Sequence, residues 1–390
     1  MTHVALQLAA ESTHSPVAAT AMLWREPGAP HEAFPVSSVT LAPGDALVEL
    51  EYATVCGSDL HTTSGRRSAP APLVLGHEQV GRVVAVGAGA RLADARPLEV
   101  GHRVVWSLTV SCGNCDRCAR GITQKCRALK KYGHERLTDS WQLSGGFATH
   151  AHLLAGTTIV AIPDELPAAI AAPLSCGTAT AVAALDRAAR AVESDGGIDG
   201  GIDGATVLVT GAGLVGLTAI AIAHDSGARV IAADPDPGRR ALAERFGAER
   251  SVDPTLPAGV AGSLRCALDE HGAGEGVDVA IEASGNPAAV AQAIDALDIG
   301  GVAVLVGSVH PSPPVALDPE RTVRGLHTVR GLHNYAPRHL EQAVEFLLAR
   351  HSAYPFDELV GDEFPLGELD AAIAAAAAGG AVRVGVLTAE

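Results

Sequence analysis

The spacing of hydrophobic positions divides the chain into two parts. Between residues 36 and 110, short apolar and β-branched runs alternate with Pro/Gly turns, and the clearest runs are Ala46–Tyr52, Val80–Val86 and Arg103–Leu108. This spacing predicts a compact, barrel-like β domain. Residues 1–20 show no clear period, so we expect an irregular leader that ends in a strand near Ala21–Trp24.

From residue 205 to residue 310, buried-type strands alternate with helical segments. The expected strands are Thr206–Thr210, Arg229–Ala233, Val277–Glu282 and Val302–Val306. The expected helices between them are Leu214–Ser226, Gly238–Phe246 and Pro287–Leu297. This alternation is the signature of a doubly wound parallel sheet, which places the second part of the chain in the α/β class.

Further elements flank the alternating region. The expected helices are Thr178–Val192, Arg338–Arg350 and Leu366–Ala378. A last strand, Val382–Leu387, is expected to return to the first domain. The Gly/Asp near-repeat at Glu193–Gly204 has the composition of a surface loop.

Composition narrows the class of partner. The 390 residues are 47% hydrophobic and 18% charged, and their formal net charge is −16. Such an acidic field repels polyanions, so we expect neither nucleic acid nor a membrane as partner. No apolar run approaches the roughly 20 residues that span a bilayer. The start of the chain, Met1-Thr2-His3, lacks the basic region of a signal peptide, so we expect a cytoplasmic protein.

A glycine fingerprint follows the first strand of the alternating region. Gly211, Gly213 and Gly216 form the pattern G-x-G-x-x-G, and Leu214 and Val215 complete the turn into the next helix. The first glycine permits a tight turn, the second lets the backbone approach a pyrophosphate, and the third lets helix and strand pack closely. Free N–H groups at the start of the helix attract phosphate, so this turn predicts a dinucleotide site.

Asp234 stands at the end of the next strand, about 20 residues further on, where such folds bind the ribose. A carboxylate there accepts hydrogen bonds from the ribose hydroxyls and repels a 2′-phosphate, which favours NAD over NADP. Arg239 and Arg240 weaken this preference, because either could bind a 2′-phosphate. The alternative is that Asp234 only caps a turn in an Asp-Pro-Asp-Pro segment.

Four of the seven cysteines lie close together at C-x2-C-x2-C-x7-C spacing: Cys112, Cys115, Cys118 and Cys126. Short C-x2-C steps let neighbouring thiolates share one tetrahedral ion, and zinc sites with four sulfur ligands are closed and structural. We expect a structural zinc ion here. An iron–sulfur cluster and four unliganded thiols are the alternatives.

Three dispersed residues, Cys56, His77 and Cys176, form a second candidate metal site. Two cysteines and one histidine that leave a fourth position open are a ligand set of catalytic zinc. Taken singly, each cysteine could be a small buried hydrophobic residue and the histidine a hydrogen-bonded core residue. Cys56 and His77 both stand in polar clusters that follow apolar runs, which favours the metal.

These motifs together resemble the zinc-containing medium-chain alcohol dehydrogenase family. The resemblance covers the chain from about residue 36 to its end, without the leader and the Gly/Asp loop. It rests on motifs in this order: Cys56-Gly-Ser58-Asp59-Leu-His61, Gly76-His77-Glu78 followed by Val80-Gly81-Arg-Val83, the four-cysteine lobe, Cys176-Gly177 and the glycine fingerprint.

The resemblance implies the fold and the domain organisation. A GroES-like β-barrel catalytic domain would comprise residues 1–180 and 338–390, with the structural zinc lobe at residues 110–128. A Rossmann domain that binds NAD would comprise residues 181–337. The family carries two zinc ions per chain, with the substrate cleft between the domains, and forms homodimers or homotetramers, usually through Rossmann-sheet edges such as Gly301–Val306.

The resemblance also implies roles for single residues. Asp59 would hydrogen-bond the zinc ligand His77 and fix its tautomer, and Glu78 would approach the catalytic zinc from behind its ligands. Zinc stabilises the alkoxide of the substrate, which passes a hydride to NAD. Ser58 would pass the released proton through the nicotinamide ribose to His61, a residue type that titrates near neutrality. The alternative for His61 is that it is a loop histidine with no part in proton transfer.

Arg383 matches an arginine that contacts the cofactor pyrophosphate in this family, the alternative being an ordinary surface charge. Two rival functions stay open. A polyol or amino-alcohol dehydrogenase of the same superfamily would keep the zinc sites, and a non-catalytic NAD-binding protein would need neither an open zinc position nor a proton relay. A zinc-free enone or quinone reductase would lack the metal ligands, so the sequence counts against it.

Basic residues give the only indication of the substrate. Arg66 and Arg67 follow His61 in a segment that lines the substrate cleft in this family, and Arg127, Lys130 and Lys131 follow the cysteine lobe. They favour an alcohol that carries an anionic group such as a phosphonate, and ordinary solvated charge is the alternative. The stretch Lys-Tyr-Gly-His-Glu is similar to a subgroup associated with phosphonate metabolism.

Overall fold

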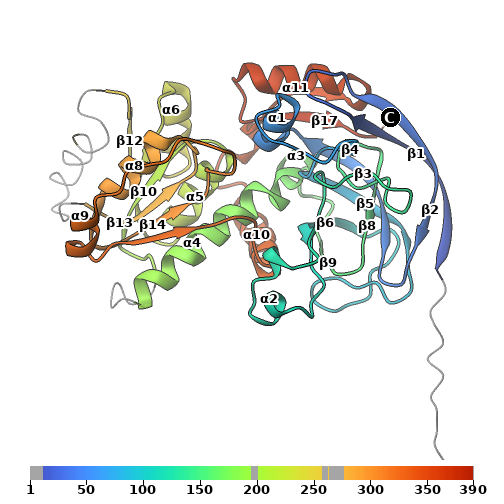
Figure 1. Cartoon of the computed structure of the whole chain (residues 1–390), viewed down its shortest axis with the longest axis horizontal. Helices are drawn as coiled ribbons and strands as arrows, with labels where there is room; N and C mark the ends of the chain where they lie inside the picture. The colour runs from blue at the N-terminus through green and yellow to red at the C-terminus, as the bar shows by residue number, and fades with distance from the viewer. Residues whose placement is uncertain (1–11, 195–200, 257–261, 263–275, 390) are drawn as a thin grey trace, which may run out of the picture. The chain divides into compact units, whose positions relative to one another are not determined.

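The computed structural model describes residues 12–194, 201–256, 262 and 276–389 (Figure 1). The chain forms two compact units. The first comprises Met1–Ser175, Asp362–Gly379 and Val384–Glu390, and the second comprises Cys176–Gly361 and Gly380–Arg383.

The first unit is built on a curled, antiparallel sheet with the strand order β16-β17-β3-β5-β6-β7, beside which β8 pairs with β3 and β9 with β6. The strands are β3 (Ala46–Thr54), β5 (Gln79–Val86), β6 (Arg103–Val110), β7 (Lys130–Lys131), β8 (His150–Leu153), β9 (Thr157–Ala161), β16 (Val360–Pro365) and β17 (Arg383–Leu387). Strand β17 pairs antiparallel with β3, so the last strand returns to the first domain, as its pattern predicted.

A second, three-stranded sheet of this unit contains β2 (Glu32–Leu41), β1 (Thr13–Trp24) and β4 (Leu73–Val74), in that order. The prediction of an irregular leader up to residue 20 was wrong for residues 13–20, because β1 already begins at Thr13 and pairs with β2. This part of β1 is mostly exposed and rich in small residues, so it lacks the apolar alternation that marks a half-buried strand. Residues 1–11 of the predicted leader lie outside the described residues.

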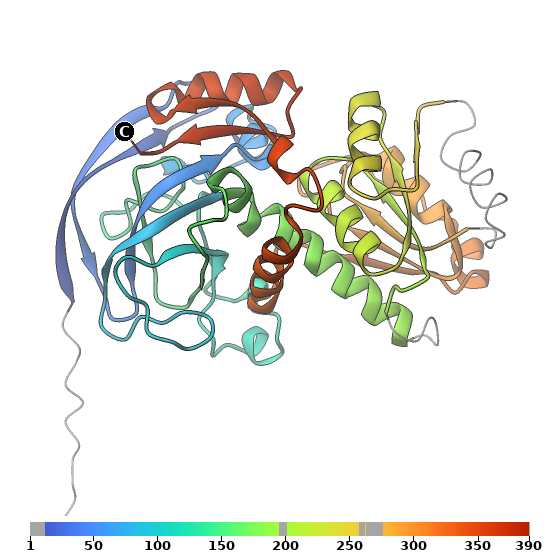
Figure 2. The ribbon, with the colours of Figure 1, turned by 180° about the vertical axis from the view of Figure 1, so that it is seen from behind.

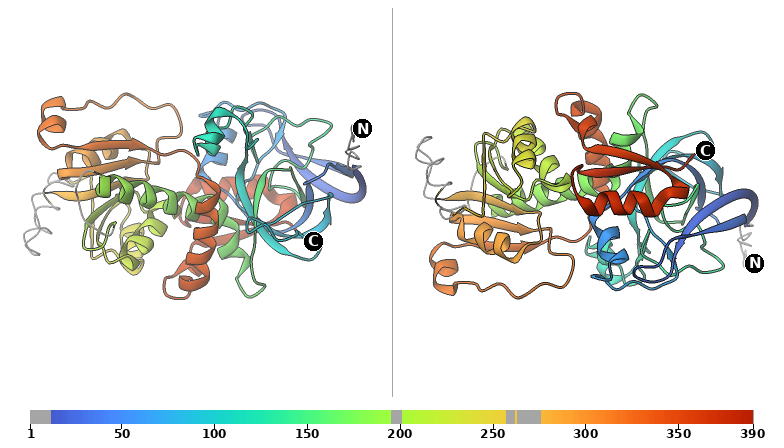
Figure 3. Two further views of the ribbon diagram at one scale, coloured as in Figure 1. Left: turned by 90° about the horizontal axis from the view of Figure 1, so that it is seen from below. Right: turned by 90° about the horizontal axis from the view of Figure 1, so that it is seen from above.

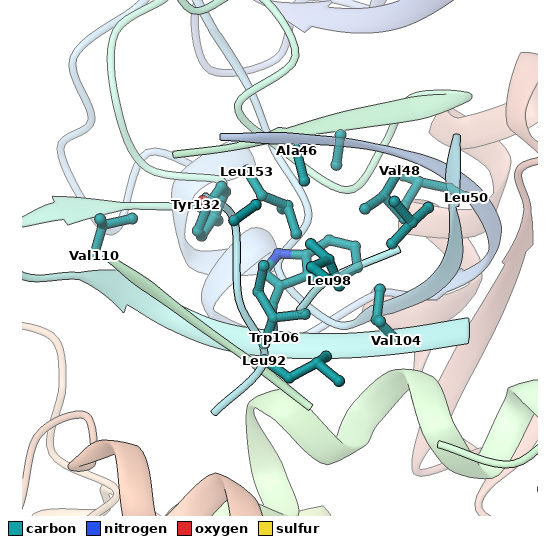
Figure 4. Close-up of a cluster of buried hydrophobic side chains, with 14 of the residues drawn as sticks. Ala46, Val48, Leu50, Leu92, Leu98, Val104, Trp106, Val110, Tyr132 and Leu153 are labelled. Carbon is teal, nitrogen blue, oxygen red and sulfur yellow. The ribbon is translucent and has the colours of Figure 1, made fainter. Parts of the chain in front are cut away.

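Trp106 lies at the centre of the apolar core of this sheet (Figure 4). Its ring meets Tyr132 edge to face at 6.4 Å between centroids, and Tyr132 meets Trp141 at 5.4 Å. Val104 and Trp106 stand two residues apart on β6 and enter the same cluster, as the period of a strand requires. Three aromatic residues, Trp106, Tyr132 and Trp141, thus fill the core of this sheet.

Short helices of the first unit position the candidate site. They are α1 (Gly57–Thr63), α2 (Asp116–Ala119), η1 (Thr123–Lys125), α3 (Ala168–Ala171), η2 (Ala172–Ser175), η4 (Leu366–Glu368) and α11 (Leu369–Ala378). Figure 2 shows α11 alongside β17 and α1. Leu369 and Ala372 of α11 pack into one cluster with Val384 and Val386 of β17, which fixes the helix on the sheet.

The second unit contains a parallel sheet with the strand order β12-β11-β10-β13-β14-β15. The strands are β10 (Thr206–Thr210), β11 (Arg229–Ala233), β12 (Arg250–Val252), β13 (Val277–Glu282), β14 (Leu297–Leu305) and β15 (Thr328–Gly331). The order reverses between β10 and β13, which confirms the predicted doubly wound sheet.

Helices lie on both faces of this parallel sheet (Figure 3). They are α4 (Gly177–Ser194), α5 (Leu214–Asp225), α6 (Pro237–Arg245), α8 (Pro287–Asp295), α9 (Pro319–Arg324) and α10 (Pro337–Arg350), with the short η3 (Phe356–Glu358). Of the predicted Gly/Asp loop, residues 195–200 lie outside the described residues, and residues 201–204 form a turn before β10.

Helix α10 belongs to the second unit, whereas we predicted residues 338–390 as part of the catalytic domain. It packs against α4, where Asp186 lies 3.0 Å from Arg338 Nη2 and 3.1 Å from His339 Nε2. Burial opposes ionisation of this carboxyl, but hydrogen bonds from His339, Arg338 and Arg190 prevail and lower the pKa of Asp186 to about 2. These contacts place residues 338–361 with the parallel sheet.

Among the described residues, no single helix has the length and apolar character to cross a membrane. The adjoining segments Ala168–Ser175 and Gly177–Val192 meet the length and composition requirement only as a bent pair.

Asp45 connects the turn before strand β3 with the end of strand β8 and the residues that follow it. Its carboxylate lies 2.9 Å from His152 Nε2 and accepts backbone N–H bonds from Ala42 at 3.0 Å and Ala155 at 2.8 Å. Burial alone would raise the pKa of Asp45, but these hydrogen bonds outweigh it and hold the pKa below its ordinary value. The ionised carboxylate therefore stabilises the fold at neutral pH.

The change Asp45→Ala should lower the free energy of unfolding of the first unit by about 2–3 kcal/mol, because it leaves buried donors without an acceptor. Tryptophan fluorescence during urea unfolding measures this unit alone, since Trp24, Trp106 and Trp141 all lie in it. Asp139→Ala, at an exposed neighbouring position, is the control and should leave the midpoint unchanged. Equal losses in both variants would contradict this role of Asp45.

Candidate active site

Cys56 lies at the junction between strand β3 and helix α1. It directly precedes the first helical residue, and its side chain is only 8% exposed. Its backbone N–H donates to Asp59 Oδ2 at 3.0 Å. The carboxylate of the first helical turn thus fixes the backbone from which the thiol projects.

His77 follows strand β4, and both of its ring nitrogens have defined neighbours. Nδ1 lies 3.5 Å from Asp59 Oδ1, and Nε2 lies 3.1 Å from Ser58 Oγ. Burial alone would lower the pKa of His77, but the charges of Asp59 and Cys56 raise it to about 10. Asp59 and His77 thus lie in close, buried contact, and the hydrogen bond expected between them stays a prediction.

Cys176 completes a cluster with Cys56 and His77, in which the three potential ligand atoms lie within 4.8 Å of one another. Chain connectivity supports this placement, since the hydroxyl of the preceding residue, Ser175, donates to the backbone oxygen of His77 at 3.2 Å. Sulfur and nitrogen ligands of one tetrahedral zinc ion lie roughly 3.5–3.8 Å apart. The donor set and its spacing therefore fit zinc.

The four-cysteine lobe also brings its thiols together. Cys115 Sγ lies 3.5 Å from Cys118 Sγ and 3.9 Å from Cys126 Sγ, and Cys126 Sγ lies 3.3 Å from Cys112 Sγ. These separations are close to the roughly 3.8 Å between sulfurs of a tetrahedral zinc site and far above the ~2.05 Å of a disulfide. Backbone N–H groups lower the pKa of Cys115 to about 6, which favours the thiolate that zinc requires.

The residues predicted for proton transfer both lie on α1. Ser58 is half-buried beside His77, and His61 stands one turn further along, in the last turn of the helix. Residues three apart face the same side of a helix. Glu78 is fully buried and accepts a hydrogen bond from Thr54 Oγ1 at 2.6 Å. Its predicted place beside the metal stays a prediction.

Three of the five basic residues are exposed and contact neighbouring surface groups. Arg66 is exposed and donates from Nε to Ser64 Oγ at 3.1 Å. Arg127 pairs with an aspartate of the cysteine lobe at 2.9 Å. The amino group of Lys130 lies 5.4 Å above the Trp141 ring.

The other two basic residues lie near the metal-ligand cluster. Arg67 is half-buried, its Nη1 lies 2.9 Å from His134 Nε2, and its charge acts on Asp59. The His134 ring lies 4.9 Å from that of His77, between centroids. The charge of Lys131 also acts on His134. His134 was not predicted as a site residue, because its position against His77 depends on tertiary packing that no local pattern indicates.

The glycine turn has the geometry that its sequence predicted. Gly211 has φ +94°, and a Cβ atom there would lie 2.9 Å from Ser284 Cβ. A Cβ atom on Gly216 would collide with the Gly211 carbonyl oxygen. Gly213 has open space on its Cβ side and directly precedes Leu214, the first residue of α5. The backbone there can approach a phosphate, while the outer glycines permit the turn and the close packing.

Asp234 accepts backbone N–H bonds from Ala212 at 2.7 Å and Asp236 at 2.9 Å. The turn-capping alternative is thus present in the structure, and the carboxylate also bonds to the glycine turn itself. Two carboxylate oxygens have about four acceptor sites, so these two bonds leave capacity for a ribose hydroxyl.

Two arginines lie close together near this turn. Arg239 donates from Nη2 to the Ala381 oxygen at 2.7 Å, and its buried Nη1 has no hydrogen-bond partner within the described part of the chain. Burial and the nearby charge of Arg383 lower the pKa of Arg239. Arg240 donates instead to the backbone oxygen of Asp234 at 2.8 Å. Arg239 is therefore the better placed of the two to bind a phosphate.

Two family models match the chain: the alcohol dehydrogenase GroES-like domain over residues 42–164 and the zinc-binding dehydrogenase over residues 215–349. L-threonine 3-dehydrogenase of Anaeromyxobacter sp. (strain K) is 33% identical over 279 residues, which are 70% of this chain and 71% of the relative. The enzyme of the same name from Deinococcus deserti is 33% identical over 281 residues, or 71% and 72% of the two chains.

Solved structures agree with these matches. An alcohol dehydrogenase from Thermotoga maritima has a TM-score of 0.86 and 27% identity, over 95% of this chain and 99% of that one. A zinc-binding dehydrogenase from Sinorhizobium meliloti, solved with NADP, has a TM-score of 0.78 and 26% identity over the same shares, 95% and 99%. The chain therefore belongs to the zinc-containing medium-chain alcohol dehydrogenase family and is a zinc-dependent oxidoreductase linked to NAD(P).

Proposed function

We propose that this protein oxidises a small alcohol that carries an anionic group, with NAD as the electron acceptor, one catalytic zinc ion and one structural zinc ion. The observation that carries the proposal is the convergence of two thiols and one imidazole, from Cys56, Cys176 and His77, within 4.8 Å. Such a set leaves one coordination position for the substrate oxygen. A non-catalytic NAD-binding protein would have no need of an open position.

When bound, the zinc ion would lower the pKa of the alcohol and NAD would accept the hydride. The surrounding residues prepare the ligands for this chemistry. Asp59 faces Nδ1 of His77, 3.5 Å away, which orients Nε2 toward the metal position. Ser58 Oγ, 3.1 Å from that nitrogen, is placed to take the substrate proton, and His61 is placed to receive it further along α1.

The proposed preference for NAD rests on Asp234, whose carboxylate lies at the glycine turn and repels a 2′-phosphate. The bonds that Asp234 already makes to the backbone hold it in this position. Arg239, with its unbonded Nη1, acts in the opposite direction, since it could pair with a 2′-phosphate. Arg383 lies close to it and is proposed to contact the pyrophosphate.

The proposed substrate class rests on the half-buried Arg67 beside the metal ligands. A hydroxyalkyl phosphonate is one alcohol of this class. The second candidate is an amino alcohol, favoured by the similarity to L-threonine 3-dehydrogenases. The two candidates share a feature, because L-threonine is itself an alcohol with a carboxylate. Rates with a hydroxyalkyl phosphonate, L-threonine and a neutral polyol distinguish them.

We further propose a homodimer or homotetramer in the cytoplasm. Strand β15 forms the outer edge of the parallel sheet, and apolar side chains near that edge are exposed: Ile299 by 75%, Val323 by 73% and Leu326 by 69%. Exposed apolar patches of this kind mark interfaces. The six cysteines of the described residues are free thiols, which fits a reducing compartment.

His77→Ala should reduce turnover by at least about a thousand-fold, because the substrate oxygen loses its electrophile. NADH fluorescence titration should give the same dissociation constant for the variant and the wild type. Zinc content should fall from about two to about one per chain, as expected for two zinc sites. Retained turnover in this variant would contradict the zinc mechanism.

Cys115→Ser provides the matched control, since it removes one zinc ion from the lobe and leaves the cluster around His77 intact. We expect a lower melting temperature, because the closed four-sulfur site contributes folding free energy. Turnover at low temperature should persist. A zinc-depleted variant with wild-type stability would contradict the structural role of the lobe.

His61→Gln should lower kcat/KM for alcohol oxidation by about ten- to hundred-fold near pH 6, because glutamine cannot accept the proton. The deficit should shrink as the pH rises and hydroxide takes over as the acceptor. Profiles of kcat/KM between pH 6 and 10 measure this change. A variant profile parallel to that of the wild type would remove His61 from the relay.

A further inference from the structure

Arg66 and Arg67 are neighbours in sequence, but they lie in different environments. The backbone N–H of Arg67 donates to the His61 carbonyl oxygen at 2.9 Å, which fixes the residue to the end of helix α1. Its side chain is half-buried and extends to His134. Arg66 is exposed and bonds only to Ser64 within the described part of the chain. Arg67 alone of this pair lies beside the metal-ligand cluster.

His134 is held in one tautomer. Its Nδ1 lies 2.9 Å from the backbone oxygen of Tyr132, an acceptor, so Nδ1 must carry the hydrogen. Nε2 therefore presents a lone pair, and the Arg67 Nη1 hydrogen donates to it at 2.9 Å. With one ring nitrogen facing an acceptor and the other facing a donor, the ring carries a single hydrogen and is neutral.

Close packing fixes this imidazole beside the metal ligand. Gly133 has φ +71°, and a Cβ atom there would collide with the carbonyl oxygen of Gly76, the residue before His77. The Gly133 N–H donates to Ser144 O at 2.8 Å. The His134 ring consequently lies 4.9 Å from the His77 ring. Only one imidazole separates the Arg67 guanidinium from a candidate zinc ligand.

The partner of Arg67 orients the guanidinium without neutralising it. Across the described ranges, no carboxylate forms a hydrogen bond with Arg67, and the imidazole that does is neutral. Burial lowers the pKa of Arg67, and the charges of Asp59 and Cys56 oppose that change. An arginine keeps its proton in such a site and has five N–H donors, of which one is used here. The remaining fork suits a carboxylate or a phosphonate.

We propose that Arg67 is the specificity-determining residue, that it binds the anionic group of the alcohol substrate, and that His134 is the positioning residue that aims it. The inference rests on the proposed function, because the alcohol oxygen must occupy the open position beside Cys56, His77 and Cys176. The substrate class is a small alcohol with a phosphonate or carboxylate a few bonds from the carbinol carbon. Lys131, whose charge acts on His134, adds to the positive field.

The test compares charged and neutral alcohols with the zinc-loaded enzyme and NAD. Arg67→Gln should lower kcat/KM for 2-hydroxyethylphosphonate and L-threonine by about ten- to hundred-fold more than for 1-propanol, the range expected for a lost charge-assisted hydrogen bond. Most of the change should lie in KM. The better of the two anionic substrates indicates whether the group is a phosphonate or a carboxylate. Arg66→Gln, the matched control, should leave the ratio of charged to neutral rates unchanged.

Binding supplies a second measurement. Calorimetry with ethylphosphonate, which has no hydroxyl to oxidise, should show weaker binding to the Arg67→Gln enzyme–NAD complex by a similar factor. Guanidinium ion added to an Arg67→Ala variant should restore part of the rate with the anionic alcohol and leave the rate with 1-propanol unchanged. His134→Leu should reduce the charge preference at wild-type zinc content, and His134→Gln, which keeps an acceptor, should recover part of it.

Two results would overturn the inference. Equal losses with charged and neutral alcohols in Arg67→Gln, together with lost zinc, would make Arg67 a support of the metal site. Unchanged rates with both would remove it from the site altogether. In either case the wild type still oxidises alcohols, so the proposed function stands. A wild-type enzyme that oxidises no alcohol would instead refute the proposed function itself.

Discussion

The candidate active site depends on one buried carboxylate, that of Asp59. Its Oδ2 accepts the Cys56 N–H at 3.0 Å, and its Oδ1 lies 3.5 Å from His77 Nδ1. The same group thus fixes the start of helix α1 and faces an imidazole that follows a different strand. A buried carboxylate is costly unless it is paired, and Asp59 accepts backbone N–H bonds from Cys56 at 3.0 Å and from Gly76, the residue before His77, at 3.4 Å. The Asp59 carboxylate therefore links the two segments of the first unit that carry Cys56 and His77.

Close backbone approach is the second constraint. Gly76 has φ +89°, and a Cβ atom there would lie 2.7 Å from the Phe147 backbone nitrogen. Gly133 packs against Gly76, and Gly146 donates its N–H to the Gly76 oxygen at 2.8 Å. Three chain segments therefore meet around His77 without side chains between them. This contact brings the His134 ring to 4.9 Å from that of His77, a candidate metal ligand, although His134 belongs to the loop after the cysteine lobe.

The sequence predicted the strands that are buried on both faces and the helices whose apolar residues recur at helical spacing. Strands β10, β11 and β13 begin and end where their apolar runs do, because strands of a parallel sheet are covered on both sides. Strand β2 was not predicted, since half of its residues are exposed and the run contains Ser and Pro. Helix α10 was predicted as a helix but was assigned to the wrong domain. Its amphipathic pattern shows that one face is buried, but the pattern does not show that α4 is the helix that covers this face.

In the candidate site, too, the local sequence pattern does not show which residues pack against one another. Cys56, His77 and Cys176 could be grouped from their local motifs, yet the five basic residues considered for the substrate looked equivalent in the sequence. Three-dimensional packing separates them, because Arg67 alone donates to an imidazole that touches a metal ligand. Because its partner His134 is neutral, Arg67 keeps its positive charge available for a ligand. A carboxylate in place of His134 would have cancelled the charge of Arg67 and made the pair structural, whereas an imidazole lone pair leaves a directed cation close to the candidate metal ligands.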